Sequence, residues 1–327
     1  MQRIWSSFKK YFSISEVNRF ILILVLSFVI YIMNPFFYNG ANLKLISVWG
    51  SIYSLMVLGQ LLYLLTGGMD LSFGGVICIS NVFIAVLILH HGVNMWLAVI
   101  IVLILGAFIG FTTGLFATTF SPPFKIILPV FIYTLMLNFV LTGIARLVTK
   151  AFPIYGFKHS YSLISTTMFG PIPIVFIYML VILLIFIYFL YFKPIGWQIY
   201  ATGLNDEVAR KVGVNIKKIR IITYTFGSMI QAFVGIIIGS YLSVGSVLIG
   251  PEYLLPVLAG AFIGGISLAG GQGSPFGAII GGFAIYLIEN IIVILQISMF
   301  WKEIVTGLFL FCFVLFDFYQ KRKRLLV

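Results

Sequence analysis

The sequence contains few charged residues. They make up 9% of its 327 residues, and only 8 residues are acidic, whereas about 25% of the residues in a soluble domain are charged. A chain with so few charges cannot cover a globular surface with polar groups, so lipid must cover most of it. The composition therefore excludes an ordinary soluble protein.

Cysteine and histidine are also scarce. The two cysteines, Cys78 and Cys312, both lie inside apolar runs, where a thiol acts as a small buried hydrophobic group. The sequence contains no Cys-x-x-Cys or His pair at ligand spacing, no nucleophile–base pair and no phosphate loop. We therefore expect no disulfide, no metal, no cofactor and no catalytic residues, and nothing in the sequence indicates an enzyme.

Long apolar runs are abundant, because 61% of the residues are hydrophobic. A membrane helix needs about 20 apolar residues, and this criterion predicts an all-α polytopic protein with ten transmembrane helices. The predicted spans are residues 20–34, 46–66, 73–90, 94–117, 124–147, 172–192, 219–243, 254–269, 275–296 and 300–317. The loops are too short for a further folded domain, so we expect residues 1–327 to form a single transmembrane domain.

The basic residues decide the expected orientation. The net charge of +12 could suggest nucleic-acid binding, but the basic residues cluster at segment ends, as the positive-inside rule requires. With the N-terminus inside, the outer segments hold only five basic residues: Lys44, Arg146, Lys150, Lys158 and Lys302. This bias predicts that both termini are cytoplasmic and that lipid, not nucleic acid, surrounds the chain.

Glycine recurs at helical spacing in two segments. One ladder has a period of four residues at Gly106, Gly110 and Gly114, and the other at Gly273, Gly277 and Gly281. Small residues at this spacing let helices approach closely in lipid, so the ladders predict helix packing. In addition, residues 67–72 resemble residues 264–269, which is consistent with an internal repeat of the kind found in transporters.

Residues 193–220 form the longest polar interruption of the apolar sequence. Asn205 is the expected N-cap of a short helix, which Gly213 ends. The helix dipole favours acids in the first turn and bases in the last, and the sequence provides both: Asp206 and Glu207, then Arg210 and Lys211. Because a flexible linker needs no such caps, we interpret the segment as a docking element. Its apolar side is expected to carry Val208, Ala209 and Val212.

Two further sets of polar residues lie in or between apolar runs. Asp70 and Ser72 follow a glycine-rich break, where they either cap the span that begins at residue 73 or act in a gate or proton path. Glu289 and Asn290 lie inside a predicted span and must face the interior of the bundle or a cavity. They serve either in a solute path or in a buried helix–helix hydrogen bond.

Three blocks of the sequence are rich in glycine and small polar residues. They are Thr66, Gly68, Asp70, Leu71, Ser72 and Gly74; Ala201, Gly203, Asn205, Ala209, Gly213 and Val214; and Gly264, Gly265, Ser267, Leu268, Gly270, Gly271 and Gly273. In order and spacing, these blocks resemble the permease subunits of ATP-binding-cassette importers of the ribose and simple-sugar type, and the likeness runs over nearly the whole chain. In this chain, Leu254 and Pro256 stand where such permeases tend to carry acids, and Glu252 lies just upstream.

The resemblance implies a complex in the bacterial cytoplasmic (inner) membrane. It implies ten spans, a second permease subunit (identical or related), ATP-binding subunits that hydrolyse ATP, and an extracytoplasmic solute-binding protein. Residues 193–220 would then be the coupling loop, and the glycine-rich blocks would be a possible gate. The implied solute is a monosaccharide such as ribose, and the alternative solutes are autoinducer-2 and nucleosides. The alternative to an ATP-driven importer is an ion-coupled secondary transporter.

Overall fold

The computed structural model describes residues 14–119 and 127–298, together with isolated positions between 300 and 311. Helices dominate these residues, and the sheet consists of one hairpin of two short strands. The elements of the first half are α2 (Ile14–Met33), η1 (Pro35–Tyr38), α3 (Gly40–Leu65), α4 (Phe73–Ala85) with the π-helical turn η2 (Val86–His90), α5 (Met95–Thr119) and α6 (Ile127–Thr149).

The second half begins with the hairpin region and ends with a long helix. Its elements are α7 (His159–Thr166), β1 (Met168–Phe169), β2 (Ile172–Pro173), α8 (Ile174–Ile187) with the π-helical turn η3 (Tyr188–Phe192), α9 (Pro194–Leu204), α10 (Asp206–Lys211), α11 (Ile216–Leu242), η4 (Pro251–Tyr253), α12 (Leu254–Ile263) and α13 (Pro275–Ile294). Helices α3, α4, α5, α8, α11 and α13 each follow a turn that contains glycine, proline or asparagine.

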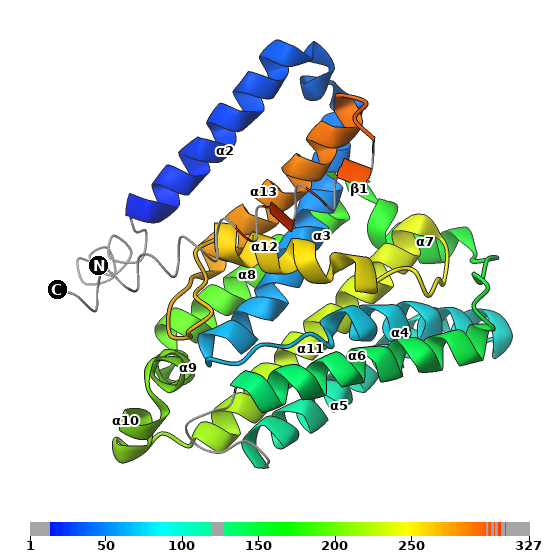
Figure 1. Ribbon diagram of the computed structural model, residues 1–327. Helices are drawn as coiled ribbons and strands as arrows, with labels where there is room; N and C mark the ends of the chain where they lie inside the picture. The colour runs from blue at the N-terminus through cyan, green and yellow to red at the C-terminus, as the bar shows by residue number, and fades with distance from the viewer. Residues whose placement is uncertain are drawn as a thin grey trace.

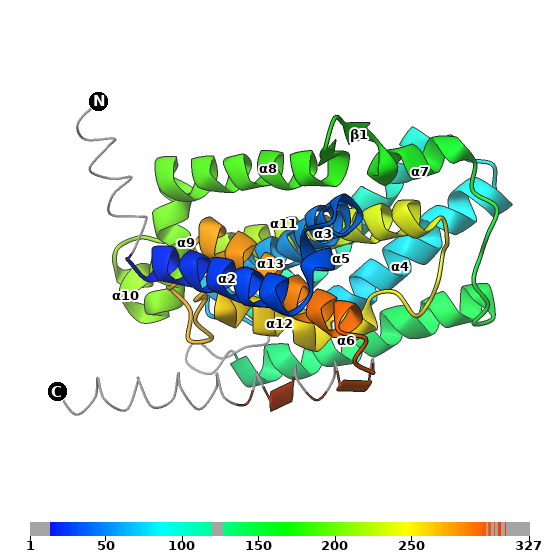
Figure 2. The same cartoon turned by 90° about the horizontal axis from the view of Figure 1, so that it is seen from above.

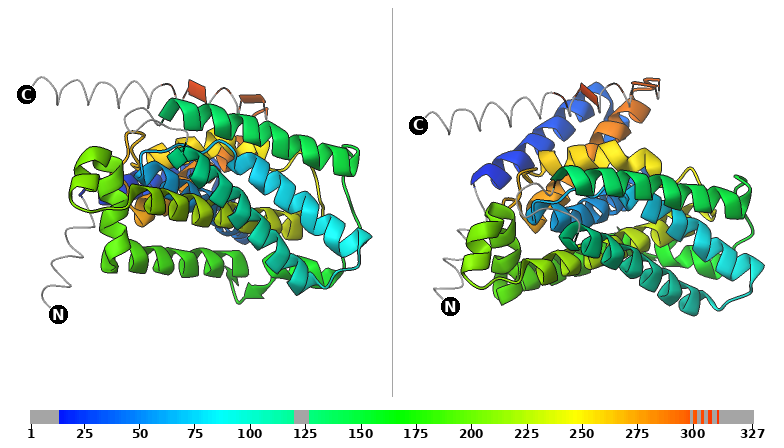
Figure 3. Two further views of the ribbon diagram at one scale, coloured as in Figure 1. Left: turned by 90° about the horizontal axis from the view of Figure 1, so that it is seen from below. Right: turned by 60° about the horizontal axis from the view of Figure 1, so that its bottom comes forward.

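Helices α3 and α11 form the centre of the bundle. Both are largely buried, and α5, α6 and α8 lie around them with much of their apolar surface exposed (Figure 1, Figure 2). Such exposed apolar surface suits lipid contact. Helices α9 and α10 project from one end of the bundle, next to the loops that follow α3 and α12 (Figure 3). We call this end the α10 end.

Seven helices in the described part of the chain are long and apolar enough to cross a membrane. They run over Gly40–Leu65, Phe73–His90, Met95–Thr119, Val130–Thr149, Ile174–Phe192, Ile216–Leu242 and Pro275–Ile294. These seven agree with predicted spans. Helix α2 occupies the first predicted span, and the last, residues 300–317, lies largely outside the described residues.

The predicted span at residues 254–269 is helical over only part of its length. Helix α12 covers only 10 residues, which at 1.5 Å per residue is about 15 Å, half the hydrocarbon thickness. Gly265 ends the helix with φ of +77°, and the N–H of Ile266 returns to the carbonyl of Ala261 at 3.0 Å. This Schellman cap stops a helix that the apolar sequence alone would continue.

The first glycine ladder packs helices together as the sequence predicts, and so do Gly277 and Gly281 of the second, whereas Gly273 lies in the loop before α13 with φ of +148°. A side chain on Gly110 would collide with the backbone carbonyl of Tyr224, so this ladder allows α5 to lie directly against α11. In the second ladder, Gly277 and Gly281 face the backbone carbonyls of Gly264 and Gly260, so α13 packs closely on α12. In lipid, such close packing holds helices together without a hydrophobic driving force.

Replacement of Gly110 by alanine should destabilise the bundle. A methyl group there meets backbone atoms that cannot move away, so we expect the free energy of unfolding to fall by about 1–3 kcal/mol. The matched control is Gly143→Ala in α6, where a Cβ meets nothing within 4 Å; alanine there should be neutral or slightly stabilising. Heating the detergent-solubilised proteins and measuring the folded fraction by size-exclusion chromatography checks this. Equal thermal midpoints would contradict the packing role of Gly110.

Candidate functional site

Helix α10 forms as the sequence predicts, with caps at both ends. The side-chain oxygen of Asn205 accepts hydrogen bonds from the N–H groups of Glu207 at 2.9 Å and Val208 at 3.1 Å. At the other end, Gly213 has φ of +88°, and the N–H of Val214 returns to the carbonyl of Ala209 at 3.0 Å. These bonds fix both ends of a six-residue helix that is too short to be stable alone.

The apolar side of α10 differs from the prediction. Ala209 is buried, with 1% of its surface exposed, because it packs inward onto the bundle. Val208 and Val212 point outward with exposed fractions of 56% and 63%, and Leu204 at the end of α9 is 65% exposed. The surface available to a partner is therefore formed by Leu204, Val208 and Val212, which we call the apolar patch, and Ala209 belongs to the support beneath it.

Charged residues around the patch have two different roles. Glu207 and Lys211 form an exposed pair at 3.3 Å, which adds little stability. Asp206 instead accepts a hydrogen bond from Arg220 of α11 at 2.6 Å, and both side chains are largely buried. Buried pairs are costly to break, because one charge is then left without compensation. The pair fixes α10 to the first turns of the central helix α11.

Helix α9, which the sequence analysis missed, connects α10 to the glycine-rich loops. A side chain on Gly203 would collide with the carbonyl of Leu65 at the end of α3 and with the N–H of Gly271. These two groups are hydrogen-bonded to each other at 3.0 Å, and Tyr200 donates to the carbonyl of Gly273 at 2.9 Å. The three sequence blocks therefore meet at the α10 end, at a contact that we call the glycine junction.

Residues 67–72 and 264–269 resemble each other in structure as well as in sequence, but the structural match is shifted by one residue from the sequence match. Gly67 has φ of +73°, and the N–H of Gly68 returns to the carbonyl of Tyr63 at 3.1 Å. This is the cap seen at Gly265, so Gly67 corresponds to Gly265 and not, as the sequence alignment has it, to Gly264. In the second loop, Arg19 donates to the carbonyl of Gly264 at 2.9 Å, and the N–H groups of Ser267 and Gly270 bond within the loop.

Asp70 is fully buried and organises the start of α4 indirectly. Its Oδ1 accepts both the N–H and the hydroxyl of Ser72 at 2.6 Å. Ser72 itself makes no side-chain cap bond to α4, contrary to the expectation. Gln60 donates to the carbonyl of Asp70, and the N–H of Leu71 donates to Thr134 of α6. The short turn around Asp70 thus ties α3, α4 and α6 together.

Glu289 and Asn290 lie on α13 near the opposite end of the bundle from α10. Tyr53 of α3 donates to Glu289 at 2.7 Å, and Asn290 and Asn42 exchange amide hydrogen bonds at 2.8 and 3.2 Å. Glu289 is partly buried and Asn290 is buried. Both residues therefore join α13 to α3, and neither faces lipid alone.

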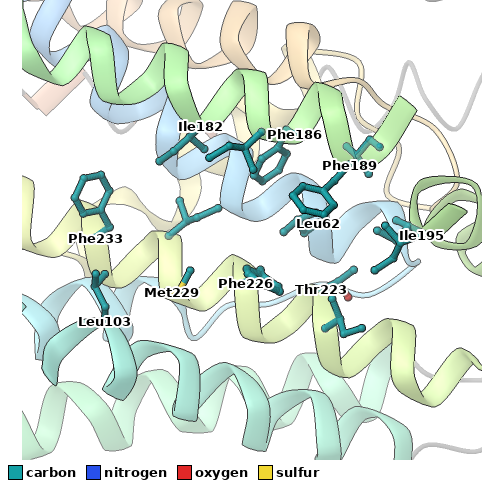
Figure 4. A pocket seen from close by; sticks show the side chains of 15 residues that line it. Leu62, Leu103, Ile182, Phe186, Phe189, Ile195, Thr223, Phe226, Met229 and Phe233 are labelled. Carbon is teal, nitrogen blue, oxygen red and sulfur yellow. The ribbon is translucent and has the colours of Figure 1, made fainter. Parts of the chain in front are cut away.

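A cavity of about 370 Å³ lies between α5, α8 and α11 (Figure 4). Its walls are aliphatic and aromatic, and Thr223 supplies the single side-chain hydroxyl. A site for a hydroxylated solute needs several convergent polar groups, so the lining of this cavity does not suit a sugar. Among the described residues, no group of three or more His, Cys, Asp or Glu could hold a metal ion.

Asparagine at position 70 should preserve the turn, whereas leucine should disrupt it. The asparagine side chain keeps an oxygen for the two Ser72 donors, while Asp70→Leu leaves both unpaired in a buried place at a cost of about 1–3 kcal/mol each. We expect Asp70→Asn to retain most transport and Asp70→Leu to assemble poorly. The measurements are solute uptake and the yield of folded protein. Loss of uptake in well-assembled Asp70→Asn protein would show that the charge itself is required.

Comparison with known proteins identifies the family of the chain. Residues 42–314 match the family described as "Branched-chain amino acid transport system / permease component". No solved structure matches. The chain is 31% identical to the ribose import permease protein RbsC of Escherichia coli strain K12 over 318 residues, which cover 94% of this chain and 96% of the relative.

Two further relatives are similar over comparable lengths. The ribose import permease protein RbsC of Haemophilus influenzae is 29% identical over 314 residues, 95% of each chain. The autoinducer 2 import system permease protein LsrC of Photorhabdus laumondii is 27% identical over 303 residues, 92% of this chain and 89% of the relative. Since the family match covers most of the chain and the Escherichia coli relative covers nearly all of it, this protein belongs to the branched-chain amino acid transport system permease family.

Proposed function

We propose that this protein is the permease of an ATP-driven importer for ribose or a similar monosaccharide, and that α10 couples it to the ATP-binding subunit. Its place in a permease family and its apolar helices make it a multi-pass protein of the bacterial inner membrane. Two of the relatives above are named for ribose import and one for autoinducer 2 import. The names favour a small hydroxylated solute, and ribose is the first to test.

The exposed apolar patch on a capped, anchored helix is the observation that carries the coupling proposal. Leu204, Val208 and Val212 are apolar, yet they occupy exposed positions that would also accommodate polar residues. Charges of both signs surround them, as in interfaces with an apolar centre and a polar rim. The buried Asp206–Arg220 pair then passes any displacement of α10 directly to α11.

The proposed assembly contains an ATP-binding subunit on the α10 side, a solute-binding protein on the other side and a second permease subunit, identical or related. ATP hydrolysis takes place on the ATP-binding subunit. The proposed topology keeps ten membrane segments with both termini in the cytoplasm. It counts α12 and the non-helical residues on either side of it as one crossing, because the chain passes there from the end of α11 to the glycine junction. An ion-coupled carrier would instead work alone and need an intramembrane acid, for which Glu289 is the candidate.

A charge in the apolar patch should weaken binding of the ATP-binding subunit. Val208→Glu places a carboxylate in the centre of the docked surface, and we expect recovery of that subunit in a pull-down to fall at least about tenfold. The matched control is Phe152→Glu, which makes the same change at a 73% exposed position near the opposite end of the bundle. Ala209→Glu would instead place a charge at a buried position, so it would test folding and not docking. Normal recovery with Val208→Glu would mean that the patch is not the docking site.

Cysteine labelling tests the orientation. With native cysteines replaced, Glu207→Cys should be unreactive toward an impermeant maleimide added to intact cells, whereas Lys158→Cys should react. Both positions are exposed in the structure, so access to water does not differ between them. After the cells are opened, both should react equally. Labelling of Glu207→Cys in intact cells would reverse the proposed orientation.

A further inference from the structure

Five aromatic side chains form a continuous series of ring contacts in the half of the bundle remote from α10. In order, they are Tyr241, Trp49, Tyr286, Tyr53 and Tyr253, with successive centroids 5.7, 6.4, 5.9 and 5.6 Å apart. They come from α11, α3, α13 and η4, and we call them the aromatic cluster. Offset and edge-on ring contacts at these distances are favourable, so the cluster holds together segments that are distant in sequence.

The cluster is only partly buried. Tyr53 and Tyr253 are buried, whereas Trp49, Tyr241 and Tyr286 are intermediate in burial. The exposed Glu252 lies next to Tyr253 in η4. The series of rings therefore begins beside an exposed acidic residue, passes through buried Tyr53 and ends at partly buried Tyr241 of α11.

Glu289 determines what the exposed part of the cluster can face. It lies three residues after Tyr286, so both side chains share one face of α13. A carboxylate in a membrane helix must face protein or water and not hydrocarbon, because its transfer into lipid is costly. Tyr53 from within the cluster donates to this carboxylate at 2.7 Å, so Glu289 is part of the same surface. Because Glu289 is only partly buried, the side of it that faces away from Tyr53 can line a water-filled path.

These groups match a neutral, polyhydroxylated solute. Aromatic ring faces pack against the C–H faces of a sugar, while carboxylate and phenol oxygens accept and donate hydrogen bonds to its hydroxyl groups. Glu289 and Glu252 disfavour an anion, and the tyrosine hydroxyls disfavour a purely apolar solute. The cavity between α5, α8 and α11 has the opposite character, because its walls are almost entirely carbon.

We propose that the aromatic cluster and Glu289 form the solute-contact surface of the translocation path, with selectivity for a small neutral sugar. This inference rests on the proposed import function and adds the residues that contact the solute. Trp49 and Tyr286 contact the sugar rings, Glu289 binds hydroxyl groups, and buried Tyr53 positions Glu289. In secondary transporters, solute sites are formed where helices are interrupted; here the short helix α12 begins directly after Tyr253, which puts an interrupted helix beside the cluster.

The test uses the full complex in proteoliposomes, with its binding protein and radiolabelled D-ribose. Trp49→Leu and Tyr286→Leu should each lower uptake per complex by about tenfold, the effect of about 1.4 kcal/mol of lost contact. Tyr286→Phe keeps the ring and should lose less. The matched control, Trp96→Leu, removes a 63% exposed indole from α5, outside the cluster, and should transport normally. Wild-type uptake in both cluster variants would overturn the inference.

Glu289→Gln separates solute contact from helix packing. Glutamine keeps an oxygen that accepts from Tyr53, so the thermal midpoint should stay close to that of the wild type, while the KM for ribose should rise about tenfold because a charged acceptor is lost. If Trp49→Leu and Tyr286→Leu fail to assemble, Glu289→Gln still tests whether this surface contacts the solute. An unchanged KM in the folded Glu289→Gln complex would overturn the inference. If the wild-type complex imports no ribose or related sugar, the proposed function itself fails, independently of these variants.

Discussion

The backbone contact at Gly203 is the constraint on which the arrangement of the α10 end depends. In a bilayer, helices associate by close packing and by hydrogen bonds, and here three segments meet with no side chain between them. Gly203 lies directly on the Leu65–Gly271 hydrogen bond. Because Leu65 ends α3 and Gly271 precedes α13, this one contact positions α9 and α10 relative to a central helix. Any larger residue at position 203 would separate the coupling segment from the bundle.

Much of the fold could be predicted because membrane helices leave strong signals in the sequence. Seven of the predicted spans correspond to long apolar helices, and the glycine ladders pack as expected except at Gly273, which lies before α13. The prediction failed at α12, where hydropathy averages over residues 254–269 and cannot detect a positive φ at Gly265. It also missed α9, because eleven residues with mixed polarity show no clear helical period.

The candidate site could be predicted where it depends on local chemistry and not where it depends on tertiary contacts. The caps at Asn205 and Gly213 follow from residue type and spacing. The burial of Ala209 and the pairing of Asp206 with Arg220 depend on how α10 lies against α11, which the sequence alone does not give. The aromatic cluster was missed for the same reason: its five residues are spread from position 49 to position 286 and share no motif.

Helix α3 connects the two regions that we propose to act in transport. Its last residue, Leu65, lies at the glycine junction, and Tyr53 and Trp49 lie in the aromatic cluster. Twelve residues of α-helix separate Leu65 from Tyr53, a distance of about 18 Å. Because a helix resists bending, displacement at the junction must move Tyr53 and with it the bond to Glu289. The bonds from Gln231 to Met56 and from Gln60 to Asp70 tie this part of α3 to α11 and to the turn before α4, so α3 cannot move without the other two helices. The proposed solute-contact surface and the proposed coupling helix α10 are therefore attached to one rigid element, through which motion at α10 would reach the aromatic cluster directly.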